Sequence, residues 1–384
     1  MNKLASFGAC LAIALGAAGC QDQMTAPTPA LATGPGAGVS LRSATVGGFV
    51  VDRGLAQLPP SARLSDLYFP TSPLRAINPD DYVCSDDSPL FSAFNATIDE
   101  FINQELGILI TLISYAADQL PTYDALFFGE AGRDQYFGYN GEYTQVLRQT
   151  ERDIKRFWDI PSDDIQVVGM HGTMLLDTAR ITAVYRTAFG LPAATADAFA
   201  AIVVQAMTAS ELVNGGNHPL FSFNAFAASF GFIPDKIVMG DGILAGYADL
   251  GFSDVAPKAI FAHEFAHHIQ FENDYFRVFE TQAEATRYGE LMADAMAAYY
   301  LTHKRGEALN AKRVAEFLDV FYQIGDCQFT NGGHHGTPNQ RLAAAEFGFR
   351  LAASAQKQGH ILSAEEFHAE FLKVYESFVA PDAP

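Results

Sequence analysis

Two histidines and a glutamate in the second half of the chain have the spacing of a metal-binding motif. Residues 263–267 have the sequence His-Glu-Phe-Ala-His. On a helix, His263 and His267 lie one turn apart on one face and can offer two imidazoles to one metal ion. Glu264 lies about 100° round the helix from His263, where it can take a proton from metal-bound water. The motif therefore predicts a zinc ion that activates water.

A zinc site of this kind needs a third protein ligand and an open position for water. The acidic residues that follow the motif supply the candidates. Glu290 and Asp294 share a helix face, so one can bind the metal while the other accepts the N–H of a ligand histidine. Alanines around them make that helix thin enough to pack closely on the first. Glu280 and Glu284 also share a face without such small neighbours and remain alternatives, whereas His268 points away from the ligand pair.

The hydrophobic pattern predicts a small sheet among many helices. Apolar residues recur at helical spacing from about residue 91, and residues 106–113 are apolar on nearly all sides, which predicts a buried helix. Capping boxes mark two helix starts, Thr337–Gln340 and Ser363–Glu366. Strands are predicted at 165–170, 221–227 and 236–239, and the chain from 255 onward is predicted to be almost wholly helical. We therefore expect an α+β fold, with a small central sheet and a helical C-terminal half that carries both motif helices.

Three short motifs in this half resemble a known family. His-Glu-x-x-His at 263–267, followed by Glu-x-x-x-Asp at 290–294, resembles the gluzincin group of zinc metallopeptidases. More narrowly, HEFAHHIQ, then ELMADA, then the segment from His335 to Arg341 are similar to motifs of the bacterial neutral zinc metallopeptidases, in the same order. The resemblance covers the region from about residue 255 to about residue 350.

The resemblance implies a zincin-like fold and a peptidase that acts on peptides or proteins. It implies that His263, His267 and Glu290 bind zinc. It also implies that Glu264 is the general base and that Asp294 orients a ligand histidine. Substrate backbone in such an enzyme commonly pairs with an edge strand, for which the segments 221–227 and 236–242 are candidates.

The oxyanion formed during hydrolysis needs a further hydrogen-bond donor. His335 is the candidate, because its His-Gly-Thr segment repeats the family motif and precedes a capped helix start. Alternatively, His335 is only a loop residue, and one of three tyrosines supplies the donor: Tyr288, Tyr299 or Tyr300.

Residues 1–19 resemble the signal peptide of a bacterial lipoprotein. Lys3 supplies a positive charge, a short apolar run follows, and small residues precede Cys20. Cleavage would leave Cys20 as the lipid-bearing first residue, and Gln21 after it favours the outer membrane of a Gram-negative cell. We expect the lipid to be the only contact with the membrane, because no 18-residue apolar run occurs after the first twenty residues.

The rest of the chain is expected to form one domain behind a tether. Residues 20–48 are rich in alanine, proline, threonine and glycine, which predicts a flexible tether, and residues 49–384 then form a single zincin-like domain. Residues 49–160 are left open as an accessory lobe. Cys84 and Cys327 remain as a pair in an oxidising compartment, so we expect a disulfide; two buried free thiols are the alternative.

Composition restricts the function further. Acidic residues outnumber basic ones by 44 to 24, giving a net charge of −20, which argues against a nucleic-acid partner. We therefore expect an envelope-anchored zinc metallopeptidase that uses zinc-activated water and a glutamate base. The alternative is a non-catalytic surface lipoprotein whose zincin-like domain is structural or vestigial.

Overall fold

The computed structural model describes residues 84, 88–277, 279, 281–327, 329, 333–354 and 359–381, and two short strands nearer the N-terminus. These strands, β1 (Ser43–Val46) and β2 (Phe49–Asp52), pair antiparallel. β1 lies inside the segment 20–48 that was predicted to be a flexible tether. The predicted signal peptide, Cys20 and Glu280 lie outside the described residues.

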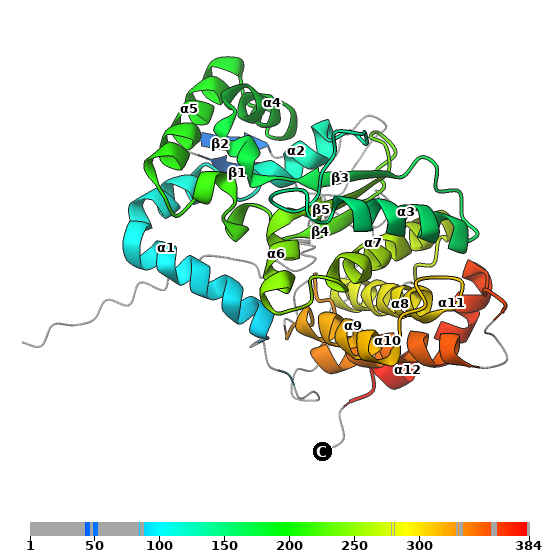
Figure 1. The fold of residues 1–384 in the computed structure, drawn as a ribbon. Coiled ribbons are helices and arrows are strands. Elements are labelled where there is room, and N and C mark those ends of the chain that lie inside the picture. Colours follow the sequence, from blue (N-terminus) through cyan, green and yellow to red (C-terminus); the bar gives the residue numbers. More distant parts are fainter. Residues whose placement is uncertain are drawn as a thin grey trace, which may run out of the picture.

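The described chain has a mixed α+β fold that is mostly helical, which confirms the predicted class at this level (Figure 1). The α-helices are α1 (Pro89–Ser114), α2 (Leu120–Phe128), α3 (Thr144–Phe157), α4 (Thr178–Ala188), α5 (Ala193–Ala209), α6 (Asp241–Asp249), α7 (Ala256–Asn273), α8 (Gln282–Thr302), α9 (Ala311–Gln323), α10 (Pro338–Ala353), α11 (Ala364–Leu372) and α12 (Tyr375–Phe378). Three short 3₁₀ helices are η4 (Gly172–Leu176), η5 (Asn214–Gly216) and η6 (Pro219–Phe221).

A three-stranded sheet lies in the middle of the fold. Its strands are β3 (Gln166–Met170), β4 (Ala225–Ala228) and β5 (Lys236–Gly240), in the order β3-β5-β4. β3 runs parallel to β5 and β4 runs antiparallel to it, with Val168 and Phe226 both opposite Val238. β5 is therefore central, and the segment 236–242 cannot serve as the edge strand that was one of the two candidates. β4 lies at an edge.

Helices α7, α8 and α10 follow one another away from the sheet (Figure 1). His268 ties α7 to the start of β5, because its Nε2 donates to the carbonyl oxygen of Lys236 at 2.9 Å. α8 and α10 are in close contact, since a Cβ added at Gly348 would lie 2.0 Å from the carbonyl oxygen of Ala295. The buried alanines of α8 leave room for this packing on α10, whereas the sequence analysis expected them to allow close packing on α7.

The two helix starts that were predicted from capping boxes are both observed. Thr337 and Gln340 form the capping box of α10, and Ser363 and Glu366 form that of α11. α8 also begins with a capping box, formed by Thr281 and Glu284, which the sequence analysis had not identified.

Helix α1 is less buried than its sequence predicted. Leu106 is 43% exposed and Ile110 is 48% exposed, whereas Leu109 and Leu112 are buried. α1 runs along the outside of the fold and presents only one face to its neighbours (Figure 1). Apolar residues on all sides of a helix thus did not mean burial on all sides, so this prediction is wrong.

One disulfide and one hydrogen bond fasten the start of α1 to the end of α9. Cys84 and Cys327 are joined by a disulfide, with a Cα–Cα distance of 5.8 Å. The backbone N–H of Leu90 donates to Oε1 of Gln323 at 3.2 Å. Within the described residues, no helix combines the length and the hydropathy needed to cross a membrane.

Candidate metal centre

Helices α7 and α8 bring together three side chains that could bind a metal ion. His263 and His267 lie on α7 and Glu290 lies on α8; each offers one ligand atom, and these atoms lie within 4.8 Å of one another. The two Nε2 atoms are 3.1 Å apart. Oxygens of Glu290 lie 3.2 Å from Nε2 of His263 and 3.4 Å from Nε2 of His267. All three side chains are almost fully buried.

These separations fit one small cation. Ligand atoms placed 2.0–2.1 Å from a zinc ion at tetrahedral angles lie about 3.3 Å apart. The Nε2–Nε2 separation of 3.1 Å lies close to this value, and each Nε2 lies 3.2 or 3.4 Å from a different oxygen of Glu290. Two imidazole nitrogens and one carboxylate oxygen also form a donor set that suits zinc and related transition metals.

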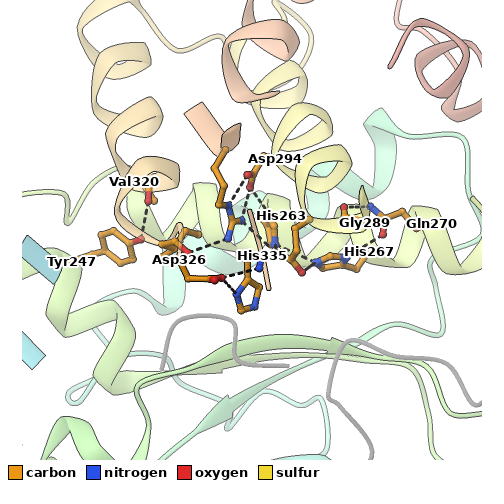
Figure 2. Close-up of polar contacts among 12 residues, drawn as sticks. Tyr247, His263, His267, Gln270, Gly289, Asp294, Val320, Asp326 and His335 are labelled. Atoms are coloured by element: carbon orange, nitrogen blue, oxygen red, sulfur yellow. Dashed lines mark hydrogen bonds and ion pairs between the residues drawn. The ribbon is translucent and has the colours of Figure 1, made fainter. Parts of the chain in front are cut away.

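Each ligand histidine has a partner that fixes which nitrogen faces the others. Nδ1 of His263 donates to Oδ1 of Asp294 at 2.9 Å. Nδ1 of His267 donates to Oε1 of Gln270 at 3.1 Å (Figure 2). With a proton on Nδ1, each neutral ring carries its lone pair on Nε2, which is the nitrogen of the metal-binding group.

A buried arginine from α10 holds the two carboxylates of α8. Arg341 donates from Nε and from one terminal nitrogen to the two oxygens of Asp294, both at 2.7 Å. The same terminal nitrogen lies 3.4 Å from an oxygen of Glu290. One guanidinium thus balances part of the negative charge of the ligand carboxylate and of the carboxylate that orients His263.

In the absence of metal, the grouped histidines and Glu290 shift the pKa values of one another. Burial lowers the pKa of His263, but hydrogen bonds to Asp294 and Glu290 outweigh it and raise the pKa to about 10. Burial also lowers the pKa of His267, and Glu290 raises it by more. Burial raises the pKa of Glu290, but the charges of His267 and His335 reverse this and hold it well below its usual range. A metal ion must therefore displace protons to bind.

Glu264 lies in the same electrostatic environment. Its side chain is fully buried on α7, and its negative charge is among the groups that raise the pKa of His267. The predicted general base is therefore near the predicted ligands.

His335 and Asp326 form a second polar group beside His263 (Figure 2). Asp326 accepts from Nδ1 of His334 at 2.7 Å, from Nδ1 of His335 at 3.0 Å and from the backbone N–H of His335 at 2.8 Å. Nε2 of His335 is buried and has no hydrogen-bond partner in the described part of the chain. Burial lowers the pKa of His335, but the charge of Glu290 and the contact with Asp326 raise it.

The alternative candidates for the third ligand and for the oxyanion donor have hydrogen-bond partners of their own. Glu284 closes the capping box of α8, so it is not a third ligand. The hydroxyl of Tyr288 contacts Nε2 of His368 at 2.8 Å, that of Tyr299 accepts from the N–H of Leu362 at 3.0 Å, and that of Tyr300 donates to Glu307 at 3.2 Å.

Three residues of the site were missed by the sequence analysis. Gln270 carries a signal that could have been used, because it lies three residues after His267 on the same helix. Arg341 lies in one of the resembling motifs, but its partners lie on another helix. Asp326 gives no local signal. No protein-family model, curated protein or solved structure matches the chain, so its function must be inferred from these residues.

Proposed function

We propose that this protein is a zinc metallopeptidase that hydrolyses peptide bonds and is attached to the bacterial cell envelope, at the outer membrane, through lipid on Cys20. The observation that carries the proposal is the arrangement of His263, His267 and Glu290. Their ligand atoms lie within 4.8 Å of one another, close enough to share one metal ion, and both imidazoles present Nε2. The resemblance to gluzincins supports peptides or proteins as substrate, with no role for nucleic acid.

The three ligand residues hold the ion, which when bound polarises the substrate carbonyl and makes water nucleophilic near neutral pH. Glu264 accepts the proton from the attacking water and passes it to the leaving amine. Asp294 keeps the ring of His263 in its binding orientation, and Arg341 keeps Asp294 in place.

His335 is proposed as the donor to the oxyanion. Asp326 accepts a hydrogen bond from Nδ1–H of His335 and stabilises the ring as an imidazolium. The imidazolium also carries a proton on Nε2, the atom that lacks a partner among the described residues. A buried charged donor of this kind stabilises developing negative charge strongly.

The burial of the ligand residues favours one second candidate, a structural metal in a non-catalytic surface lipoprotein. Structural zinc is usually held by four protein ligands, whereas a catalytic zinc has three and keeps an open position. The candidate group within the described residues has three members, and a buried glutamate follows the first of them. This composition favours the catalytic proposal.

The deciding experiment measures metal by mass spectrometry on purified residues 21–384, beside the His263→Ala variant. About one zinc per chain that is lost in the variant supports the site. Digestion of casein or a peptide library, with Glu264→Gln as the inactive control, then tests peptidase activity. A protein that takes up no zinc after reconstitution contradicts the proposal, and a zinc-loaded protein without hydrolytic activity favours the structural alternative.

A further inference from the structure

We propose that Gln270 is a positioning residue that fixes His267 as a metal ligand through Nε2 and couples this ligand to the backbone beside Glu290. The inference rests on the metal site of the proposed function but not on the reaction catalysed there. Gln270 lies on α7, one turn after His267, and its side chain reaches α8 (Figure 2).

A backbone carbonyl sets the orientation of the Gln270 amide. Nε2 of Gln270 donates to the carbonyl oxygen of Gly289 at 2.8 Å, and this oxygen can only accept. The amide oxygen must therefore face Nδ1 of His267, 3.1 Å away. An oxygen in that place requires a proton on Nδ1, which leaves the lone pair of the neutral ring on Nε2. The orientation of one amide thus decides which imidazole nitrogen can bind the metal.

Burial makes this bridge specific. Gln270 is 1% exposed, so water does not compete for its amide, and both ends of the amide are paired. A buried polar group that loses its partner costs about 1–3 kcal/mol, so alternative orientations of the amide are disfavoured. His267 is therefore held in one tautomer and one ring orientation.

The bridge also connects the two ligand helices at the metal site. Gly289 directly precedes Glu290, and a Cβ added at Gly289 would lie 3.5 Å from Oε1 of Gln270, so the amide packs against the backbone there. Displacing Gln270 would move the ring of His267 and release the backbone next to Glu290 at the same time. The other ligand histidine, His263, has a charged partner instead, which is itself held by an arginine.

Two substitutions distinguish the effect of the Gln270 amide oxygen, which accepts from His267, from that of its NH₂ group, which donates to Gly289. Gln270→Met removes both and keeps the length of the side chain. Gln270→Glu keeps an oxygen that accepts from His267 but loses the donor to Gly289. Asn273→Ala is the matched control, because the Asn273 amide lies on the same helix and donates to the carbonyl of Ile269 in its own helix.

Zinc affinity, measured by competition with a chelator, and the melting temperature of the metal-free protein are the first readouts. We expect Gln270→Met to weaken zinc binding by about 10–100-fold. We expect Gln270→Glu to bind zinc nearly as well as the wild type while its metal-free form melts at a lower temperature. Equal affinity of wild type and Gln270→Met, or equal losses in both variants, would overturn the proposal, because Gln270 would then act only as a structural link.

The Nδ1 proton of His267, observed by NMR after selective ¹⁵N-histidine labelling, gives a readout that does not depend on metal. It should be protected from exchange in the wild type and in Gln270→Glu, and exposed to exchange in Gln270→Met. If the wild type binds no zinc, the proposed function fails, but this signal still decides the inference. Unchanged protection in Gln270→Met would then overturn it.

Discussion

Arg341 and Asp294 form a fully buried, side-on ion pair in which two hydrogen bonds of 2.7 Å join the guanidinium to both carboxylate oxygens. Asp294 uses one of these oxygens to accept from Nδ1 of His263 as well. The pair therefore has two roles that can be separated: it joins α10 to α8, and it orients His263, one of the three candidate metal ligands.

A double-mutant cycle on this pair is expected to show strong coupling. Removing one partner of a buried ion pair leaves the other charge uncompensated and costs about 3–5 kcal/mol, whereas removing both costs less. Arg341→Met should therefore lower the free energy of unfolding more than the double variant Arg341→Met/Asp294→Asn does. Asp294→Asn alone should weaken zinc binding by about 10–100-fold. Urea denaturation and chelator competition measure the two effects, and additive stability losses would contradict the coupling.

Glu264→Gln is expected to separate metal binding from hydrolysis. The amide is close in shape to the carboxylate but cannot take a proton from water, so peptide hydrolysis should fall by about 10²–10⁴-fold or more. Zinc content should stay at the wild-type level, because Glu264 is not one of the three grouped ligands. Glu272→Gln, an exposed substitution on the same helix, is the control and should keep full activity. Undiminished hydrolysis in Glu264→Gln would rule out the assigned base.

His335 and His334 provide a matched pair for testing the oxyanion donor. Both donate from Nδ1 to Asp326 and both are buried. Of these two histidines, His335 is the one whose charge is among the groups that lower the pKa of Glu290. We expect His335→Gln to reduce kcat by about 10²–10³-fold with zinc content unchanged, and His334→Gln to affect mainly stability. Equal losses of kcat in the two variants would show that the loop matters only as a structural unit.

The features that could be predicted from the sequence involve residues within one or two helical turns of each other. His263 and His267 are one turn apart, as are Glu290 and Asp294, so helical geometry alone placed each pair on one face. The capping boxes at Thr337 and Ser363 are likewise complete within four residues. The α+β class followed from the change in hydrophobic period between strands and helices.

What could not be predicted depends on contacts between distant segments. Asp326 meets His335 across a loop, and Arg341 reaches Asp294 from another helix 47 residues along the chain. The exposure of Leu106 depends on where α1 lies in the fold, and the central place of β5 depends on which strands pair with it. Residue periodicity carries no information on any of these relationships.

His218 is expected to make the fold less stable in mild acid. Burial lowers the pKa of His218 below its usual 6.5, although the charge of Glu100 partly opposes this. Below about pH 6.5, His218 therefore binds a proton in the unfolded chain, whereas in the folded chain it does so only at lower pH. This contribution to stability is complete above pH 6.5 and is lost as the pH falls towards the lowered pKa of the folded state.

The variant His218→Asn tests this assignment. Nδ1 of His218 accepts from the N–H of Leu220 at 3.1 Å, and an asparagine oxygen can replace that cap without titrating. Melting temperatures between pH 7.5 and 5.5 should decline less in the variant than in the wild type. Parallel declines would assign the acid sensitivity to other groups.

The disulfide between Cys84 and Cys327 joins residues 243 positions apart, and Cys327 directly follows the aspartate that holds His335. A ribosome must add most of the chain before the second thiol exists, so oxidation is a late event in biogenesis. Until then, the strand–helix segments between the two cysteines fold without this constraint. A preparation made in a reducing cytoplasm would therefore contain complete chains with an uncrosslinked Asp326 loop, and such material needs an oxidation step before its zinc content and stability are compared with those of the disulfide-bonded protein.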